Sequence, residues 1–121
     1  MENLGYGFED CMKKIHEHIT ISLKATTKLL NPMNRKHCFQ IFGYDFMIDQ
    51  SGYPWLIEVN TNPCIEESSK LLQTLLPRLL DDAFKLTLDP LFYGSVSSGK
   101  FRVEGYQDHA NMWENLNSDF K

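Results

Sequence analysis

Hydrophobic residues recur at intervals of three and four along residues 8–30. The series consists of Phe8, Met12, Ile15, Ile19, Leu23, Thr26 and Leu30. This spacing places its members on one face of an α-helix, with Thr26 as the only polar member. Asn31 and Pro32 follow directly, and the residue before a proline is disfavoured in helical conformation. The pattern therefore predicts an amphipathic helix over residues 8–30.

Two apolar segments further along the chain have the character of β-strands, at residues 38–49 and 54–60. Residues 50–53 between them form a short polar linker that contains Gly52, which is typical of a β-hairpin turn. If residues 50–53 alone form the loop, so that residue 49 pairs with residue 54, the numbers of all paired residues sum to 103. One face of the hairpin then carries only apolar pairs. These pairs are Tyr44–Val59, Phe46–Ile57 and Ile48–Trp55, so Trp55 is assigned to the core.

The opposite face of the same hairpin carries Asp45 directly across from Glu58. Like charges at such a distance destabilise a sheet, so the pair requires a shared proton or a bound cation. Asn60 lies on the same face as Glu58 and adds an amide oxygen, while Gly43 opposite it is expected to leave space above the sheet. Oxygen ligands of this kind suit Mg²⁺. The alternative is that both carboxylates are solvated on an exposed face.

A second helix is predicted over residues 67–86. Its broad apolar face consists of Leu71, Leu72, Leu75, Leu76, Leu79, Leu80, Ala83 and Phe84. Pro77 lies inside this helix, so a kink or two abutting helices is expected, with Pro77 in the first turn of the second. Asp89 and Pro90 are predicted to end the element. Residues 93–121 lack strong periodicity and are expected to form a loosely packed polar extension, with a short strand at 101–106.

Composition narrows the classes of function. The 121 residues are 42% hydrophobic, which is enough for a packed core, and no run approaches the roughly 20 apolar residues of a membrane span. Residues 1–40 carry six Lys/Arg and four Asp/Glu, whereas residues 41–121 carry six Lys/Arg and twelve Asp/Glu. The acidic second part argues against a nucleic-acid partner and favours a cation site. Three widely spaced cysteines fit a reducing compartment better than a disulfide framework.

The segments CFQIFGYDFMID and PWLIEVNTNP, followed by the leucine-rich helix ending LTLDPLF, resemble the tubulin-tyrosine-ligase-like family of ATP-grasp enzymes. The resemblance covers about residues 36–92. It implies that residues 1–92 are the carboxy-terminal portion of an α+β ATP-grasp domain, a hairpin flanked by helices. It also implies that Asp45, Glu58 and Asn60 hold Mg²⁺ together with the phosphates of ATP.

The resemblance further implies a reaction. ATP phosphorylates a protein carboxylate, and the amine of glutamate, glycine or tyrosine displaces the phosphate to give an amide. Tubulin or microtubules would be the partner, in the cytoplasm and cytoskeleton, including the cilium or axoneme. In the family, the adenine-binding strands and phosphate-gripping lysines lie upstream of these motifs. The 121-residue chain alone is therefore expected to be inactive.

Two other functions remain open. The chain could be a catalytically inactive truncated paralogue that acts as a structural cytoskeletal or axonemal binding module. It could also belong to an ATP-grasp ligase with a small-molecule substrate. The apolar helix face and the unpaired hairpin edges indicate that upstream chain or another protein covers them.

Overall fold

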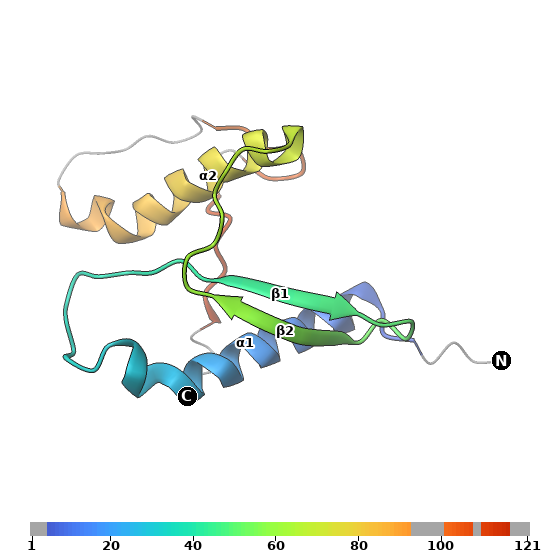
Figure 1. Ribbon diagram of the computed structural model, residues 1–121. Helices are drawn as coiled ribbons and strands as arrows, with labels where there is room; N and C mark the ends of the chain where they lie inside the picture. The colour runs from blue at the N-terminus through green and yellow to red at the C-terminus, as the bar shows by residue number, and fades with distance from the viewer. Residues whose placement is uncertain (1–4, 93–100, 108–109, 117–121) are drawn as a thin grey trace. The chain divides into compact units, whose positions relative to one another are not determined.

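The computed structural model describes residues 5–92, 101–107 and 110–116. Its elements follow in the order α1 (Phe8–Leu30), β1 (Gly43–Ile48), β2 (Pro54–Asn60), α2 (Lys70–Thr87) and the short 3-10 helix η1 (Asp89–Leu91) (Figure 1). β1 and β2 pair antiparallel in a two-stranded sheet. The predicted α+β class and the order of helix, hairpin and helix are confirmed. No helix in the described ranges has the length and apolar character needed to cross a membrane.

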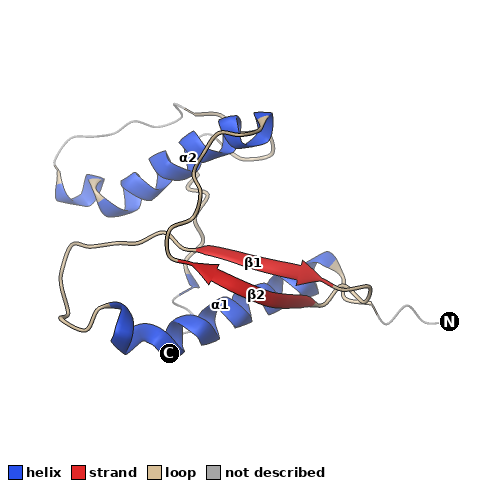
Figure 2. Cartoon of the chain, in the orientation of Figure 1, coloured by secondary structure: helices blue, strands red, loops and turns tan. Residues whose placement is uncertain are grey.

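The described residues divide into two compact units. The first contains residues 5–36, 40–63 and 116, and therefore α1 and the hairpin. The second contains residues 37–39, 64–92, 101–107 and 110–115, and therefore α2. Figure 2 shows the helices and strands of both units and the loops that connect them.

In the first unit, α1 lies against the apolar face of the hairpin and has the predicted bounds. His18 of α1 stacks on Phe46 of β1, with 6.1 Å between the ring centroids. The Ser22 hydroxyl and the Tyr44 hydroxyl are hydrogen-bonded at 2.9 Å. These contacts anchor the middle of the helix to the first strand, so the helix and the strand hold each other in place.

The predicted hairpin register is correct at one end and wrong at the other. Gly43 pairs with Asn60, Tyr44 with Val59 and Asp45 with Glu58, as expected. A β-bulge follows Asp45, and the remaining pairs are Phe46–Leu56, Met47–Trp55 and Ile48–Pro54. Ile57 is the extra residue of the bulge. Because side chains alternate between the two faces, this one-residue shift places residues 54–56 of β2 on the opposite face from the one predicted.

Trp55 is not a core residue, contrary to the sequence prediction. Its partner Met47 lies on the face of Asp45, and Trp55 is 56% exposed. The indole Nε1 donates a hydrogen bond of 2.9 Å to Asp49 Oδ2, and the ring lies edge-on to Tyr53. The polar edge of the ring thus finds its partner in the turn, and the buried position goes to Pro54.

In the second unit, α2 is one continuous helix through Pro77, so neither of the predicted interruptions occurs as a break. Proline removes one hydrogen bond of the helix. Leu76 and Arg78 on either side of Pro77 are both buried, and such packing stabilises a helix more than propensity does. The Ser69 side chain caps the first turn by accepting a hydrogen bond from the Leu72 N–H.

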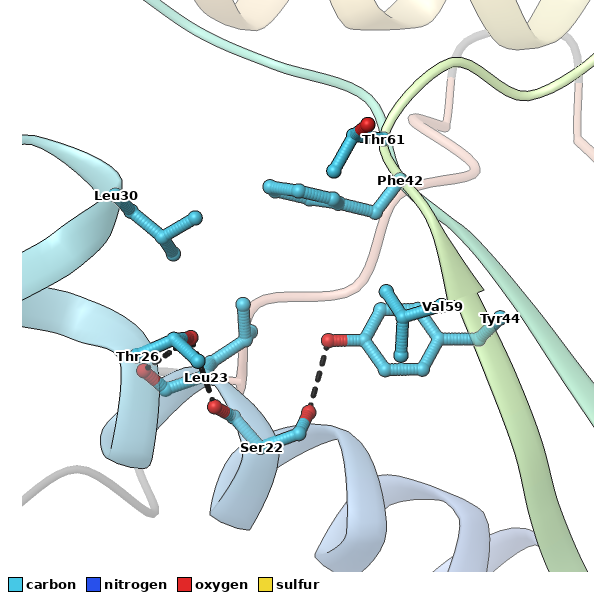
Figure 3. Close-up of a pocket in the computed structure, with 8 residues that line it drawn as sticks. All are labelled: Ser22, Leu23, Thr26, Leu30, Phe42, Tyr44, Val59 and Thr61. Atoms are coloured by element: carbon cyan, nitrogen blue, oxygen red, sulfur yellow. Dashed lines mark hydrogen bonds between the residues drawn. The ribbon is translucent and has the colours of Figure 1, made fainter.

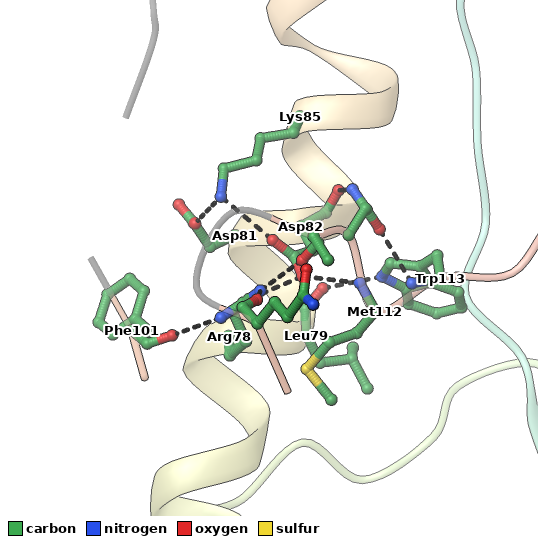
Figure 4. A network of polar contacts seen from close by, with 11 residues as sticks. Arg78, Leu79, Asp81, Asp82, Lys85, Phe101, Met112 and Trp113 are labelled. Atoms are coloured by element: carbon green, nitrogen blue, oxygen red, sulfur yellow. Dashed lines mark hydrogen bonds and ion pairs between the residues drawn. The ribbon is translucent and has the colours of Figure 1, made fainter. Parts of the chain in front are cut away.

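Arg78 and Asp82 of α2 are the most deeply buried charged residues of the described chain, each 1% exposed. Arg78 Nε donates to Asp82 Oδ2 at 2.7 Å. The two terminal nitrogens of Arg78 donate to backbone carbonyls of Phe101, Gln107 and Ala110, and Figure 4 labels the bond to Phe101. One guanidinium thus satisfies three carbonyls of a segment that has no regular secondary structure to satisfy them.

Further contacts join this segment to α2. The Met112 N–H donates to Asp82 Oδ2, and the Asn111 amide donates to the Asp82 carbonyl. Trp113 Nε1 donates to the Leu79 carbonyl at 3.0 Å. The strand expected at 101–106 is absent from the described residues, and the Phe101 carbonyl at its start accepts a hydrogen bond from Arg78. Residues 93–100 of the predicted extension lie outside the described residues.

Candidate functional site

The three residues predicted as metal ligands lie together on one face of the hairpin. Asp45 comes from β1, and Glu58 and Asn60 come from β2. Asn60 Nδ2 donates to Asp45 Oδ2 at 3.0 Å and to Glu58 Oε1 at 3.2 Å. The local antiparallel register brings them together, because Asp45 is paired directly with Glu58, and Asn60 is two residues beyond it.

Hydrogen bonding to both carboxylates explains the position of the Asn60 amide. Two carboxylates paired across a sheet repel each other. The amide nitrogen carries two hydrogens, and each carboxylate accepts one of them. The same amide turned by half a rotation would present Oδ1 to the space between the carboxylates. The cluster therefore offers either a bridging donor or a third oxygen ligand.

The chemistry of this donor set fits a hard cation. Mg²⁺ is typically bound by one or two carboxylates, with water and phosphate oxygens completing its octahedron. Among the described residues, no three His, Cys, Asp or Glu side chains form a metal-binding group. The third protein oxygen would therefore come from the Asn60 amide. Asp45 and Glu58 are both exposed, so solvent and phosphate oxygens have access to them.

The space that the sequence led us to expect above Gly43 is filled by Pro63. A Cβ atom at position 43 would lie 3.1 Å from Pro63 Cβ and 3.6 Å from Asn60 Cβ. The turn after Asn60 therefore folds back over the start of β1, on the face that carries the cluster. Gln40 Nε2 donates to the Thr61 carbonyl at 2.9 Å and holds the same turn. Sequence analysis missed the role of Gln40, since nothing in the strand pattern distinguishes it.

Asp49 is a third hairpin carboxylate, and it serves the turn. Its Oδ1 accepts hydrogen bonds from the Ser51 N–H, the Ser51 hydroxyl and the Tyr53 N–H, and Oδ2 accepts from Trp55 Nε1. The Ser51 and Trp55 side chains stabilise the ionised form most, and together with the backbone donors they lower the pKa of Asp49 to about 2. These donors occupy both oxygens, so Asp49 belongs to the fold of the turn.

A separate cavity of about 210 Å³ lies between α1 and the hairpin. Apolar side chains and hydroxyl groups line it, as Figure 3 shows for Ser22, Leu23, Thr26, Leu30, Phe42, Tyr44, Val59 and Thr61. Tyr44 and Val59 are paired on the face of the hairpin opposite the carboxylates. The cavity therefore contains none of the three predicted ligands, and it is distinct from the candidate metal site.

Several known proteins with related sequences are named for modifying tubulin. A probable alpha-tubulin polyglutamylase, Ttll1 of Tetrahymena thermophila, is 33% identical over 64% of this chain and 18% of its own length. Tubulin glycylase 3B of the same organism is 35% identical over 68% of this chain and 7% of its own length. The probable tubulin polyglutamylase TTLL9 of Bos taurus is 40% identical over 54% of this chain and 14% of its own length.

The chain thus spans less than a fifth of the length of these relatives. No solved structure matches it. The sequence pattern of the tubulin-tyrosine ligase family matches residues 2–95, which include α1, the hairpin, α2 and η1. The described elements are accordingly those of a partial ATP-grasp domain, and the chain belongs to the tubulin-tyrosine ligase family.

Proposed function

We propose that this chain supplies the magnesium- and phosphate-binding part of an ATP-dependent ligase that joins an amino acid to a carboxylate of tubulin or a similar protein. The observation that carries the proposal is the cluster of Asp45, Glu58 and Asn60. Two carboxylates from paired strands meet one amide at 3.0 and 3.2 Å. Membership of the family agrees with this chemistry.

Each residue has a distinct task in the proposed site. Asp45 and Glu58 supply two negative charges that attract a divalent cation, and the paired strands keep these charges close together. Asn60 separates the carboxylates by hydrogen bonding and would turn its oxygen toward the cation. Bound magnesium would supply charge neutralisation at the phosphate oxygens of ATP.

The proposed substrates follow from the relatives. Their names describe polyglutamylases and glycylases of tubulin, so glutamate or glycine is the proposed amino acid, with tyrosine as the third member of the family's range. The proposed acceptor is a tubulin carboxylate, activated by phosphate transfer from ATP. Microtubules of the cytoplasm or the cilium are the proposed place of action.

A nucleotide titration tests the proposal in a full-length ligase of the family that carries this segment, because the adenine-binding strands lie upstream of it. A fluorescent ATP analogue would be titrated with and without Mg²⁺ against the wild type, Asp45→Asn and Glu66→Gln. Glu66 is an exposed carboxylate outside the cluster, so Glu66→Gln controls for the loss of one charge. We expect the wild type and Glu66→Gln to bind the analogue only when Mg²⁺ is present. Asp45→Asn should lose about tenfold or more in affinity, since it removes a charged ligand.

Nucleotide binding that ignores Mg²⁺, or that Asp45→Asn leaves unchanged, would contradict the proposed site. In that case a co-sedimentation experiment with microtubules would decide whether the chain acts as a structural binding module. That experiment requires neither nucleotide nor metal, so its result is independent of the titration.

A further inference from the structure

Pro63 lies unusually close to the backbone of Gly43. A Cβ atom on residue 43 would lie 3.1 Å from Pro63 Cβ, which is tighter than nine in ten Cβ contacts in proteins. The same atom would lie 3.6 Å from Asn60 Cβ, an ordinary contact. The absence of a side chain at position 43 therefore permits the approach of Pro63 and leaves Asn60 undisturbed.

The reason for glycine at this position is space, not backbone conformation. Gly52 and Gly105 are the described glycines with positive φ, and Gly43 is not among them. Gly43 begins β1 as a regular pairing partner of Asn60. Alanine at position 43 is compatible with such an extended backbone. Its only conflict would be with Pro63.

Gln40 fixes the other side of the same turn. Its side-chain amide donates a 2.9 Å hydrogen bond to the carbonyl of Thr61, the residue directly after Asn60. The turn at residues 61–63 is thus held at its first residue by Gln40 and rests on Gly43 at its last. Asn60 is the last residue of β2, so the direction of its side chain depends on how this turn is held.

We infer that Gly43 and Pro63 form a positioning contact for Asn60: the packing of the proline on the bare glycine backbone holds the Asn60 amide between Asp45 and Glu58. This inference rests on the proposed function for its consequence, because the amide position sets the geometry of the metal site. It concerns a contact between two residues that are themselves neither charged nor ligands.

A double-mutant cycle tests the contact, since a Cβ atom can be moved from one residue to the other. Gly43→Ala adds the Cβ that conflicts with Pro63. Pro63→Gly removes the opposing Cβ, and the double variant combines the two changes. Gly7→Ala is the control, because a Cβ at position 7 would meet only Asp10 Oδ2, at 3.8 Å.

The first measurement is the NMR signal of the Asn60 side-chain amide in the full 121-residue chain. In the wild type, both amide hydrogens are bonded to carboxylates, so their exchange with water should be slow. Gly43→Ala should speed this exchange by about tenfold, the factor for one hydrogen bond to a charged group. The double variant should return to the rate of Pro63→Gly. The Trp55 indole signal reports whether the far end of the hairpin stays folded.

The second measurement is a titration with Mn²⁺ alone, followed by paramagnetic broadening at residues 45, 58 and 60. Gly43→Ala should raise the midpoint by about 10-fold or more, as loss of outer-shell support does at metal sites. Gly7→Ala should leave it unchanged. The double variant should again resemble Pro63→Gly.

The outcomes separate this inference from the proposed function. Unchanged Asn60 exchange in Gly43→Ala refutes the positioning contact, whatever Mn²⁺ does. A double variant whose Asn60 amide exchanges faster than that of Pro63→Gly refutes it as well, since the conflict with Pro63 would not be the cause. Absence of Mn²⁺ broadening in the wild type contradicts the proposed function, while the Asn60 signal still decides the contact.

Discussion

Substitution of Arg78 by methionine should strongly destabilise the second unit. Methionine keeps an unbranched apolar side chain but removes all the N–H donors. Asp82 then loses the guanidinium and keeps Lys85 and the Met112 N–H as partners, while three backbone carbonyls lose their donors. Removal of one partner from a buried ion pair costs about 3–5 kcal/mol. The whole stability of a domain is about 5–15 kcal/mol, so this loss is a large fraction of it.

Urea unfolding measures this loss. With a slope of about 2 kcal/mol per molar, the midpoint of Arg78→Met should fall by about 2 M. Trp113 is the reporter, because its indole donates to the Leu79 carbonyl within the same unit. Trp55→Phe as the background removes the other tryptophan from the signal. Arg35→Met is the matched control, and since Arg35 is exposed, its cost should stay within about 0.5 kcal/mol.

The pair also predicts a rescue. Replacement of both buried charges by apolar residues is often close to neutral, so Arg78→Met combined with Asp82→Leu should recover the part of the loss that is due to Asp82, but not the part due to the three carbonyls. A cost below about 1 kcal/mol for Arg78→Met would refute the reasoning. That result would mean that water or other donors satisfy Asp82 and the three carbonyls once the guanidinium is gone.

Two further predictions concern the hairpin. The pKa of Asp49 is lowered from 3.8 to about 2. The contribution of its ionised form to stability is therefore complete above about pH 4 and is lost as the pH falls through 2. Asp49→Asn should remove this pH dependence, which the Trp55 indole NMR signal would report between pH 1.5 and 5. A Trp55 signal that keeps the same titration in Asp49→Asn would contradict the assignment. Asn60→Asp should place a third carboxylate beside Asp45 and Glu58 and lower the metal-free stability by about 0.2–1 kcal/mol. Mn²⁺ should restore this stability in thermal unfolding. Equal stability with and without Mn²⁺ would argue against a cation site.

Much of the site could be predicted because its signals are local. The sequence places Asp45 and Glu58 on strands of opposite direction, and the short loop between the strands limits their register. Near the open end of the hairpin, Gly43 and Asn60 pair as predicted. The clustering of the three candidate ligands depends only on this end, so the bulge beyond Asp45 does not disturb it.

Other features depend on contacts that no pattern in the sequence displays. The bulge at Ile57 inserts one residue into β2 and moves Trp55 to the face of the carboxylates. An alternation rule assumes one-to-one pairing, so it cannot detect this insertion. Asp49 supplies the polar partner that makes an exposed Trp55 favourable.

The second unit shows the same limit for helices. Pro77 predicts an interruption from propensity alone, but the helix continues where its neighbours are buried. Arg78 and Asp82 have the spacing of an ordinary exposed ion pair on a helix. Only the backbone of residues 101–107 and 110–113 reveals that they are buried, because carbonyls from distant residues surround the guanidinium.

The most direct test of the proposed metal site is thermal unfolding of a full-length ligase that carries this segment and of its Glu58→Gln variant, each with and without Mg²⁺ and a non-hydrolysable ATP analogue. The wild type should be stabilised by about 2.7 kcal/mol when the ligand is at 100 times its dissociation constant, and Glu58→Gln should gain far less. Without ligand, Glu58→Gln should be as stable as the wild type or slightly more stable, by up to about 1 kcal/mol, because the repulsion from Asp45 is relieved. Equal stabilisation of both proteins by Mg²⁺ and the analogue would contradict the assignment of Asp45, Glu58 and Asn60 as the site.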